Sequence, residues 1–127
     1  MMNTVVYSPE APEPIGPYSQ AIVAGNTLFA SGQIAIDRGS DNLITGNIED
    51  ETKQVMTNLA HVLKAAGFSF KDVVKCTIFL KDMNNFPKVN AIYGQYFTER
   101  PPARETVEVS RLPKDVNVEI SCMAVKS

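Results

Sequence analysis

The chain has 127 residues and a formal charge of −2, and 44% of its residues are apolar and 20% charged. This length suits one domain with a real hydrophobic core, and we expect residues 1–127 to form it. The basic side chains are scattered rather than clustered, which argues against a nucleic-acid partner. No apolar run approaches the roughly 20 residues that span a bilayer, and no signal segment is recognisable, so we expect no membrane association and a cytoplasmic location.

Cysteine and histidine usage predicts no metal site. The two cysteines, Cys76 and Cys122, each lie in a strand-like apolar run, which is typical of buried, reduced thiols. The one histidine, His61, has no cysteine or carboxylate near it at metal-ligand spacing. We interpret His61 as part of a solvated helix face rather than as a catalytic group.

The first part of the chain predicts short strands separated by turns. The run "NTVVY" (3–7) indicates a strand, and prolines at positions 9, 12, 14 and 17 end it. Next, "SQAIVAGNTLFASGQI" predicts a hairpin, because Gly25-Asn26 suits a turn with positive φ between two apolar runs. The polar segment "DRGSDNLITG" is interpreted as a loop.

Two helices and a strand follow. A helix is predicted over 48–66, with Asn47 as its cap and Gly67 just beyond its end. Its apolar stripe comprises Val55, Leu59, Val62, Leu63 and Ala66. The run "DVVKCTIFLKD" predicts a strand with Val74, Cys76, Ile78 and Leu80 on one face and Lys75, Thr77 and Phe79 on the other. A second helix is predicted over 85–98, with Pro87 in its first turn and Phe86, Val89, Tyr93, Tyr96 and Phe97 on its buried side.

The stretch "PPARETVEVSRLPKDVNVEI" (101–120) predicts two final strands with polar faces. Period-two alternation separates Arg104, Thr106 and Glu108 from Val107 and Val109. In the last strand it groups Asn117, Glu119 and Ser121 opposite Val118 and Ile120. The link "SRLPKD" either closes a hairpin between these strands or joins two strands that are not neighbours.

This order of elements predicts an α+β fold of two layers, a mixed β-sheet with two helices on one face. We expect the polar residues of the final strands on the uncovered face, together with Lys75, Thr77 and Phe79. Such a face is too apolar for full solvation and too polar for a core. A mixed face of this kind is typical of a subunit interface, so we expect an oligomer.

Few residues remain as candidates for chemistry. The chain lacks the short motifs of serine hydrolases, P-loop and dinucleotide-binding proteins and zinc proteases. Arg104 suits two-point binding of a carboxylate, or alternatively an interface salt bridge. Glu119 suits general acid/base catalysis if its pKa is shifted, or is an ordinary surface glutamate. Tyr18 and the Ser31-Gly32-Gln33 segment add small polar groups beside glycines.

Four segments in this order resemble the RidA/YjgF family, the reactive intermediate deaminases. They are "IGPYSQA" (15–21), "ASGQI" (30–34), "KVNAIYGQYF" (88–97) and the stretch 101–120, so the resemblance covers essentially the whole chain. It implies a fold like that of the small chorismate mutases and a homotrimer with helices outside and sites between subunits. It also implies that the two final strands are not neighbours.

The resemblance further implies an enzyme that hydrolyses 2-imino acids, or their enamine tautomers, to 2-oxo acids and ammonia. The expected substrates are 2-iminobutanoate and 2-iminopropanoate released by pyridoxal-phosphate enzymes, and no cofactor is expected. By position, Arg104 is implied to bind the substrate carboxylate and Glu119 to activate the attacking water. The other implied substrate-binding residues are Tyr18, Ser31, Gly32, Asn90 and Thr106.

Two residues depart from the family pattern. Thr106 stands where some members have a cysteine, so no activity that depends on that thiol is expected. Glu105 stands where a small residue is usual, and alternation assigns it to the helix side with Ala103 and Val107. Two other functions compete with the deaminase: a non-catalytic trimer that binds small carboxylates and regulates a partner, and a ribonuclease, which the charge of −2 and the single histidine disfavour.

Overall fold

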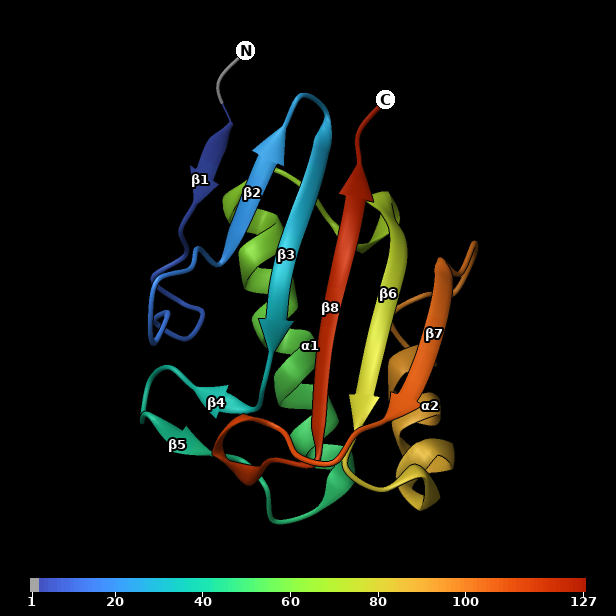
Figure 1. The fold of residues 1–127 in the computed structure, drawn as a ribbon. Helices are drawn as coiled ribbons and strands as arrows, with labels where there is room; N and C mark the ends of the chain where they lie inside the picture. The colour runs from blue at the N-terminus through green and yellow to red at the C-terminus, as the bar shows by residue number, and fades with distance from the viewer. Residues whose placement is uncertain (1–2) are drawn as a thin grey trace.

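The computed structural model describes residues 3–127, and its main feature is a mixed sheet of six strands. The strands are β1 (Thr4–Val6), β2 (Ala21–Ala24), β3 (Thr27–Gln33), β6 (Val73–Leu80), β7 (Ala103–Glu108) and β8 (Val118–Val125). They lie side by side in the order β1-β2-β3-β8-β6-β7 (Figure 1). Neighbouring strands are antiparallel except for β6 and β7, which are parallel.

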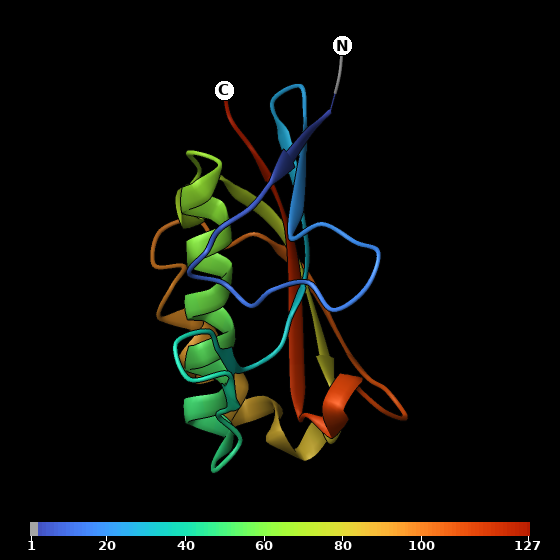
Figure 2. The same ribbon diagram turned by 90° about the vertical axis from the view of Figure 1, so that its left-hand side faces the viewer.

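Both helices, α1 (Ile48–Ala65) and α2 (Phe86–Gly94), cover the same face of this sheet (Figure 2). The other face carries no α-helix among the described residues, so the expected α+β fold with two helices on one face is confirmed. Three single 3-10 turns, η1 (Phe70–Asp72), η2 (Met83–Asn85) and η3 (Pro113–Asp115), lie between elements. Within residues 3–127, no helix combines the length and the apolar character needed to cross a membrane.

Helix α1 follows its local sequence closely. Asn47 caps it by accepting a hydrogen bond from the amide of Asp50 at 2.8 Å, and Gly67 beyond its end has a φ of +78°. Its stripe packs on β3 and β8. The fully buried members are Val55, Met56, Leu59, Val62 and Leu63. This face supplies much of the hydrophobic core, as the pattern predicted.

The N-terminal strands also match the prediction, with one addition. Gly25 has a φ of +63° in the turn between β2 and β3, and Ala21 pairs with Ala30 across the hairpin. The segment expected as a polar loop contains a small ribbon, in which β4 (Ile36–Asp37) pairs with β5 (Asn42–Leu43). Two residues per strand give too little alternation to be recognised in a sequence.

Strand β6 places the two cysteines opposite each other in the core. Cys76 pairs with Cys122 of β8, and both thiols are free and buried, as expected. The prediction that Val74 shares the face of Cys76 is wrong. The pairing of β6 with β8 shifts between Val73 and Lys75, so Val73 is buried and Val74 is 45% exposed.

Helix α2 is shorter than predicted. Pro87 lies in its first turn as expected, but the helix ends at Gly94 rather than near Thr98. The chain then tightens, since the amide of Tyr96 donates to the carbonyl of Tyr93. Tyr96 and Phe97 still pack against Phe70, with ring centroids 5.3 and 5.4 Å away. Tyr96 and Phe97 are therefore partly buried at the spacing expected for a helix, although the helix has already ended.

Strand β7 presents the opposite faces from those predicted. Its parallel register with β6 sets Arg104 beside Cys76 and Glu105 beside Thr77. Because Cys76 faces the helices, Arg104 does too, and Thr106 and Glu108 follow it by alternation. Glu105 lies on the uncovered face, where its carboxylate contacts Lys75 Nζ at 3.2 Å and accepts a hydrogen bond from the Thr77 hydroxyl. Placing Arg104, Thr106 and Glu108 on the uncovered face, and Ala103, Glu105 and Val107 on the helix side, was wrong.

Strand β8 is largely as predicted. Glu119 pairs with Phe79 and Ser121 with Thr77, both on the uncovered face. Asn117 is the exception, because it precedes the strand and its side chain donates to Glu51 of α1. Strand β6 lies between β7 and β8, so the segment "SRLPKD" does not close a hairpin.

Candidate functional site

Four of the predicted site residues line one cavity of about 560 Å³, which we call the Glu119 cavity. They are Tyr18, Ser31, Gly32 and Glu119. One wall comes from residues 8–18, the proline strap between β1 and β2, and another from the end of β3. The turn η3 adds Lys114 at the side. Segments distant in sequence therefore meet around one carboxyl group.

Glu119 lies directly over the backbone of Gly32. A Cβ atom at position 32 would overlap Oε2 of Glu119, so the close approach requires glycine. The pairing of β3 with β8 is irregular between Ala30 and Gln33, which is where Gly32 lies. This irregularity gives the carboxyl group its place against the strand.

The surroundings of Glu119 alter its acidity. The side chain is half-buried, and this burial raises the pKa of Glu119 above the ordinary value for glutamate. A raised pKa brings a carboxyl group closer to the range in which it can both accept and release a proton. The geometry thus fits the general acid/base role that the resemblance implied.

A buried glutamate fixes the start of the strand that carries Glu119. Glu51 of α1 is fully buried and accepts hydrogen bonds from the amides of Asn117 (2.7 Å) and Val118 (3.2 Å). It also accepts one from Asn117 Nδ2 at 2.8 Å. Because Glu119 is the next residue after Val118, these bonds set where its side chain emerges.

Ser31 is hydrogen-bonded to the two residues that follow the strap, and Tyr18 to a residue within it. The Ser31 hydroxyl donates to the carbonyl of Ser19 at 2.6 Å, and its amide donates to the carbonyl of Gln20 at 2.9 Å. The Tyr18 hydroxyl accepts a hydrogen bond from the amide of Ile15 at 3.4 Å. Ser31 therefore contributes to the shape of the cavity through the backbone it holds, and its oxygen keeps acceptor capacity.

A second group, the Arg104 cluster, consists of Arg104, Asn90, Phe86 and Tyr93. The Arg104 guanidinium carbon lies 5.3 Å from the centre of the Phe86 ring and 5.0 Å from that of Tyr93. Nη1 donates to Asn90 Oδ1 at 2.7 Å. The remaining N–H groups make no hydrogen bond to residues 3–127, and the side chain is exposed. Helix α2 therefore holds the Arg104 guanidinium in place and leaves its other N–H groups available to a ligand.

The remaining substrate-binding predictions fall beside this cluster. Asn90 supports Arg104 and does not line the Glu119 cavity. The Thr106 hydroxyl is buried, with no hydrogen-bond partner among the described residues. Arg104 and Glu119 lie on opposite faces of the sheet with β6 between their strands. One chain therefore carries two separate halves of the predicted site.

Several residues that line the Glu119 cavity were not predicted from the sequence. Glu13 and Lys114 both line the Glu119 cavity. Lys114 has a φ of +55°, which is uncommon for a residue with a side chain, and the turn-forming "LPKD" was the only sequence signal for it. Among residues 3–127, no three His, Cys, Asp or Glu side chains gather to hold a metal ion.

Comparison with known proteins identifies the family. The family model described as Endoribonuclease L-PSP matches residues 8–126. The chain belongs to this family, which is the RidA/YjgF family. A RutC family protein of Pyrococcus horikoshii is 54% identical over 125 residues, which cover 98% of this chain and 99% of that protein.

Other family members carry more specific names. The 2-iminobutanoate/2-iminopropanoate deaminase of Bos taurus is 43% identical over 126 residues, 99% of this chain and 92% of the bovine protein. The crystal structure of E. coli TdcF with bound serine has a TM-score of 0.94 and 35% identity, covering 98% of this chain and 99% of TdcF. The family name thus spans proteins described as endoribonuclease and as deaminase.

Proposed function

We propose that this protein hydrolyses 2-imino acids, such as 2-iminobutanoate and 2-iminopropanoate, to 2-oxo acids and ammonia. The observation that carries the proposal is the half-buried Glu119 carboxyl group over Gly32, in a cavity and with a raised pKa. The 43% identity to the bovine deaminase supports the same reaction. Such imines are unstable products of dehydration by pyridoxal-phosphate enzymes.

In the proposed reaction, Glu119 acts first as a base. It accepts a proton from a water molecule while the water oxygen forms a bond to the C=N carbon, giving a tetrahedral amino alcohol. Glu119 then passes its proton to the amino group, and the C–N bond breaks to release ammonia while the hydroxyl group gives its proton back to Glu119 and becomes the carbonyl of the 2-oxo acid. Glu119 finally releases this proton to solvent, where ammonia takes it up as ammonium. General acid/base catalysis of this kind contributes roughly 10²- to 10⁴-fold. The protonated imine carbon is already electrophilic, so the proposal includes no cofactor.

Arg104 binds the substrate carboxylate in this proposal. Its guanidinium is permanently charged and is already oriented by Asn90 and two aromatic rings. Charge-assisted hydrogen bonds contribute about 1.5 to 3 kcal/mol each, enough to orient a small acid. Preorganisation by α2 reduces the entropy lost on binding.

The two halves meet in a homotrimer in our proposal, with Arg104 of one subunit completing the Glu119 cavity of its neighbour. Support comes from their position on opposite faces of one sheet. It also comes from the uncovered face, which exposes Phe29 (44%) and Val107 (40%). Exposed apolar side chains on an uncovered sheet face are typical of an interface.

A second candidate is a non-catalytic protein that binds small carboxylates and regulates a partner. The bound serine of TdcF favours it, since that ligand is a small amino acid. The two candidates differ in what they require of Glu119. A binding protein retains 2-oxobutanoate binding and its biological effect in Glu119→Ala, whereas the deaminase loses turnover.

Threonine dehydratase with semicarbazide as a competing trap provides the test. Semicarbazide captures the free imine, so an imine hydrolase accelerates the appearance of 2-oxobutanoate relative to the semicarbazone. We expect the wild-type protein to accelerate it and Arg104→Ala not to. No acceleration by the wild-type protein, or full acceleration by Arg104→Ala, contradicts the proposal. Lys53→Gln, on the exposed face of α1, is the matched control.

A further inference from the structure

The proline strap forms a wall of the Glu119 cavity but has little regular structure to hold it. No helix or strand is found between Val6 and Ala21, although five of these residues line the cavity, namely Pro12, Glu13, Ile15, Tyr18 and Gln20. Ile15 is 67% exposed and Tyr18 51% exposed, so core packing does not fix them. Ala11 packs into the hydrophobic core, but the exposed part of the wall that follows it depends on polar contacts for its position.

Gln20 supplies one anchor, at the buried inner side of the strap. Its side chain is 1% exposed, and its Oε1 accepts a hydrogen bond from the Ser8 amide at 2.6 Å. Its Nε2 donates to the carbonyls of Ser8 (3.1 Å) and Pro12 (2.9 Å). These bonds satisfy the backbone of the first half of the strap, where prolines cannot donate.

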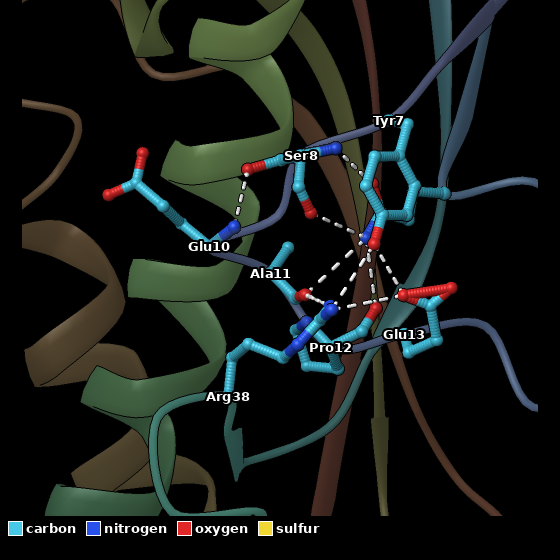
Figure 3. Close-up of polar contacts among 8 residues, drawn as sticks. Tyr7, Ser8, Glu10, Ala11, Pro12, Glu13 and Arg38 are labelled. Carbon is cyan, nitrogen blue, oxygen red and sulfur yellow. Dashed lines mark hydrogen bonds and ion pairs between the residues drawn. The ribbon is translucent and has the colours of Figure 1, made fainter.

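Arg38, in the loop after β4, supplies a second anchor from outside the strap. Nη1 donates to the carbonyl of Ala11 at 2.6 Å, and Nη2 donates to the Tyr7 hydroxyl at 3.2 Å and to Glu13 Oε1 at 3.1 Å. The Tyr7 hydroxyl also donates to Glu13 Oε1 in a short bond. Figure 3 shows the guanidinium pointing into the bend formed by Ala11, Pro12 and Glu13. One cation thus joins both sides of the bend to the β4–β5 ribbon.

The same contacts neutralise a charge in the cavity wall. Glu13 lines the Glu119 cavity and forms an ion pair with Arg38 at 3.1 Å. Without Arg38, the Glu13 carboxylate would keep its hydrogen bond from Tyr7 but would place an unneutralised negative charge at a cavity that, in the proposed function, receives an anionic substrate. Arg38 can therefore act through position, through charge, or through both.

We propose that Arg38 is a positioning residue for the imine-hydrolase site, a role that rests on the proposed function. It fixes the proline strap through Ala11, Tyr7 and Glu13 and so sets the wall of the Glu119 cavity against which the substrate is held. It does not contact the reacting atoms. Loss of Arg38 weakens substrate binding, while the chemistry at Glu119 proceeds once substrate is bound.

Steady-state kinetics of Arg38→Gln and Tyr7→Phe, with Arg38→Lys as the conservative variant, test this role. We expect Arg38→Gln to raise KM about three- to tenfold with kcat changed less than about twofold, and Tyr7→Phe to raise KM less. Arg38→Lys should raise KM less than Arg38→Gln does, because lysine keeps the positive charge but lacks the planar guanidinium with its several donors. The exposed Lys53→Gln variant retains wild-type constants. A fall in kcat at unchanged KM overturns the proposal.

A double variant separates position from charge. If Arg38 served only to neutralise Glu13, Arg38→Gln/Glu13→Gln would restore the wild-type KM, and the positioning role would be wrong. We expect KM to remain raised, because the bond to the Ala11 carbonyl is still missing. With the Glu13→Gln single variant added, the double-mutant cycle isolates the coupling of these two residues, which are in contact.

Amide hydrogen exchange of residues 9–18 tests the clamp without any substrate. We expect the hydrogen-bonded amides of this segment, those of Glu10, Ala11, Ile15 and Tyr18, to exchange about three- to tenfold faster in Arg38→Gln than in wild-type protein or Lys53→Gln, with α1 unchanged. Unchanged exchange in the strap contradicts the clamp even in an active enzyme. If the wild-type protein hydrolysed no imine but Arg38→Gln still accelerated exchange in the strap, the proposed function would be wrong and the clamp would stand.

Discussion

The Glu119 cavity and the Arg104 cluster differ in what the surrounding chain does to their ionisable group. Glu119 is half-buried over a glycine, and burial raises its pKa, which disfavours its charged form. Arg104 is exposed, and two aromatic rings and Asn90 hold its charged form in place. A proton-transfer group needs an environment that makes both protonation states accessible, whereas a carboxylate anchor must stay charged. The two halves are each suited to one of these tasks.

Replacing the acid should have the largest effect. We expect Glu119→Gln to reduce kcat about 10²- to 10⁴-fold, because the amide cannot accept the proton of the attacking water. Binding of 2-oxobutanoate, measured by calorimetry, should change much less. A variant with near wild-type kcat would show that another group activates the water.

Mixing two inactive variants tests whether the halves belong to different subunits. If each site takes Glu119 from one chain and Arg104 from its neighbour, then trimers reassembled from equal amounts of Arg104→Ala and Glu119→Gln should regain about a quarter of wild-type activity. The quarter follows from random placement, since one site in four joins an intact glutamate to an intact arginine. Activity no higher than that of the separate variants would place both residues of a site in one chain.

The sequence predicted these two halves unequally, for physical reasons. Helix α1 was predictable because its cap at Asn47 and its apolar stripe are local signals. The face of β8 was predictable because Val118, Ile120 and Cys122 are all apolar and buried. On β7 neither face is strongly apolar, and alternation decides which residues share a face but not which face is covered. That choice depends on β6 and α2, which pair with and pack on β7 from elsewhere in the chain.

Replacement of Gly32, the glycine under Glu119, should have the next largest effect. We expect Gly32→Ala to lower kcat/KM about tenfold or more, because the new Cβ would overlap Glu119 Oε2 and displace the carboxyl group. Kinetics together with a crystal structure of the variant would measure both effects. Gly94→Ala is a suitable control, because a Cβ there meets no atom within 4 Å. An unchanged kcat/KM for Gly32→Ala would mean that the position of Glu119 is not critical.

The smallest expected effect is on stability, and it has opposite signs in the two halves. Because the pKa of folded Glu119 is raised, the folded protein binds the proton more tightly than the unfolded chain. Stability is therefore lost as pH rises from the ordinary glutamate pKa through the raised one. Glu119→Gln should raise Tm at neutral pH, and this advantage should disappear as the pH falls below the ordinary glutamate pKa.

Arg104→Met should instead lower stability by about 1 kcal/mol at neutral pH, since it loses cation–π contacts and the bond to Asn90. If calorimetry showed the same direction of stability change for both variants, the contrast would be wrong: burial would not destabilise the charged form of Glu119 while contacts stabilise the Arg104 cation.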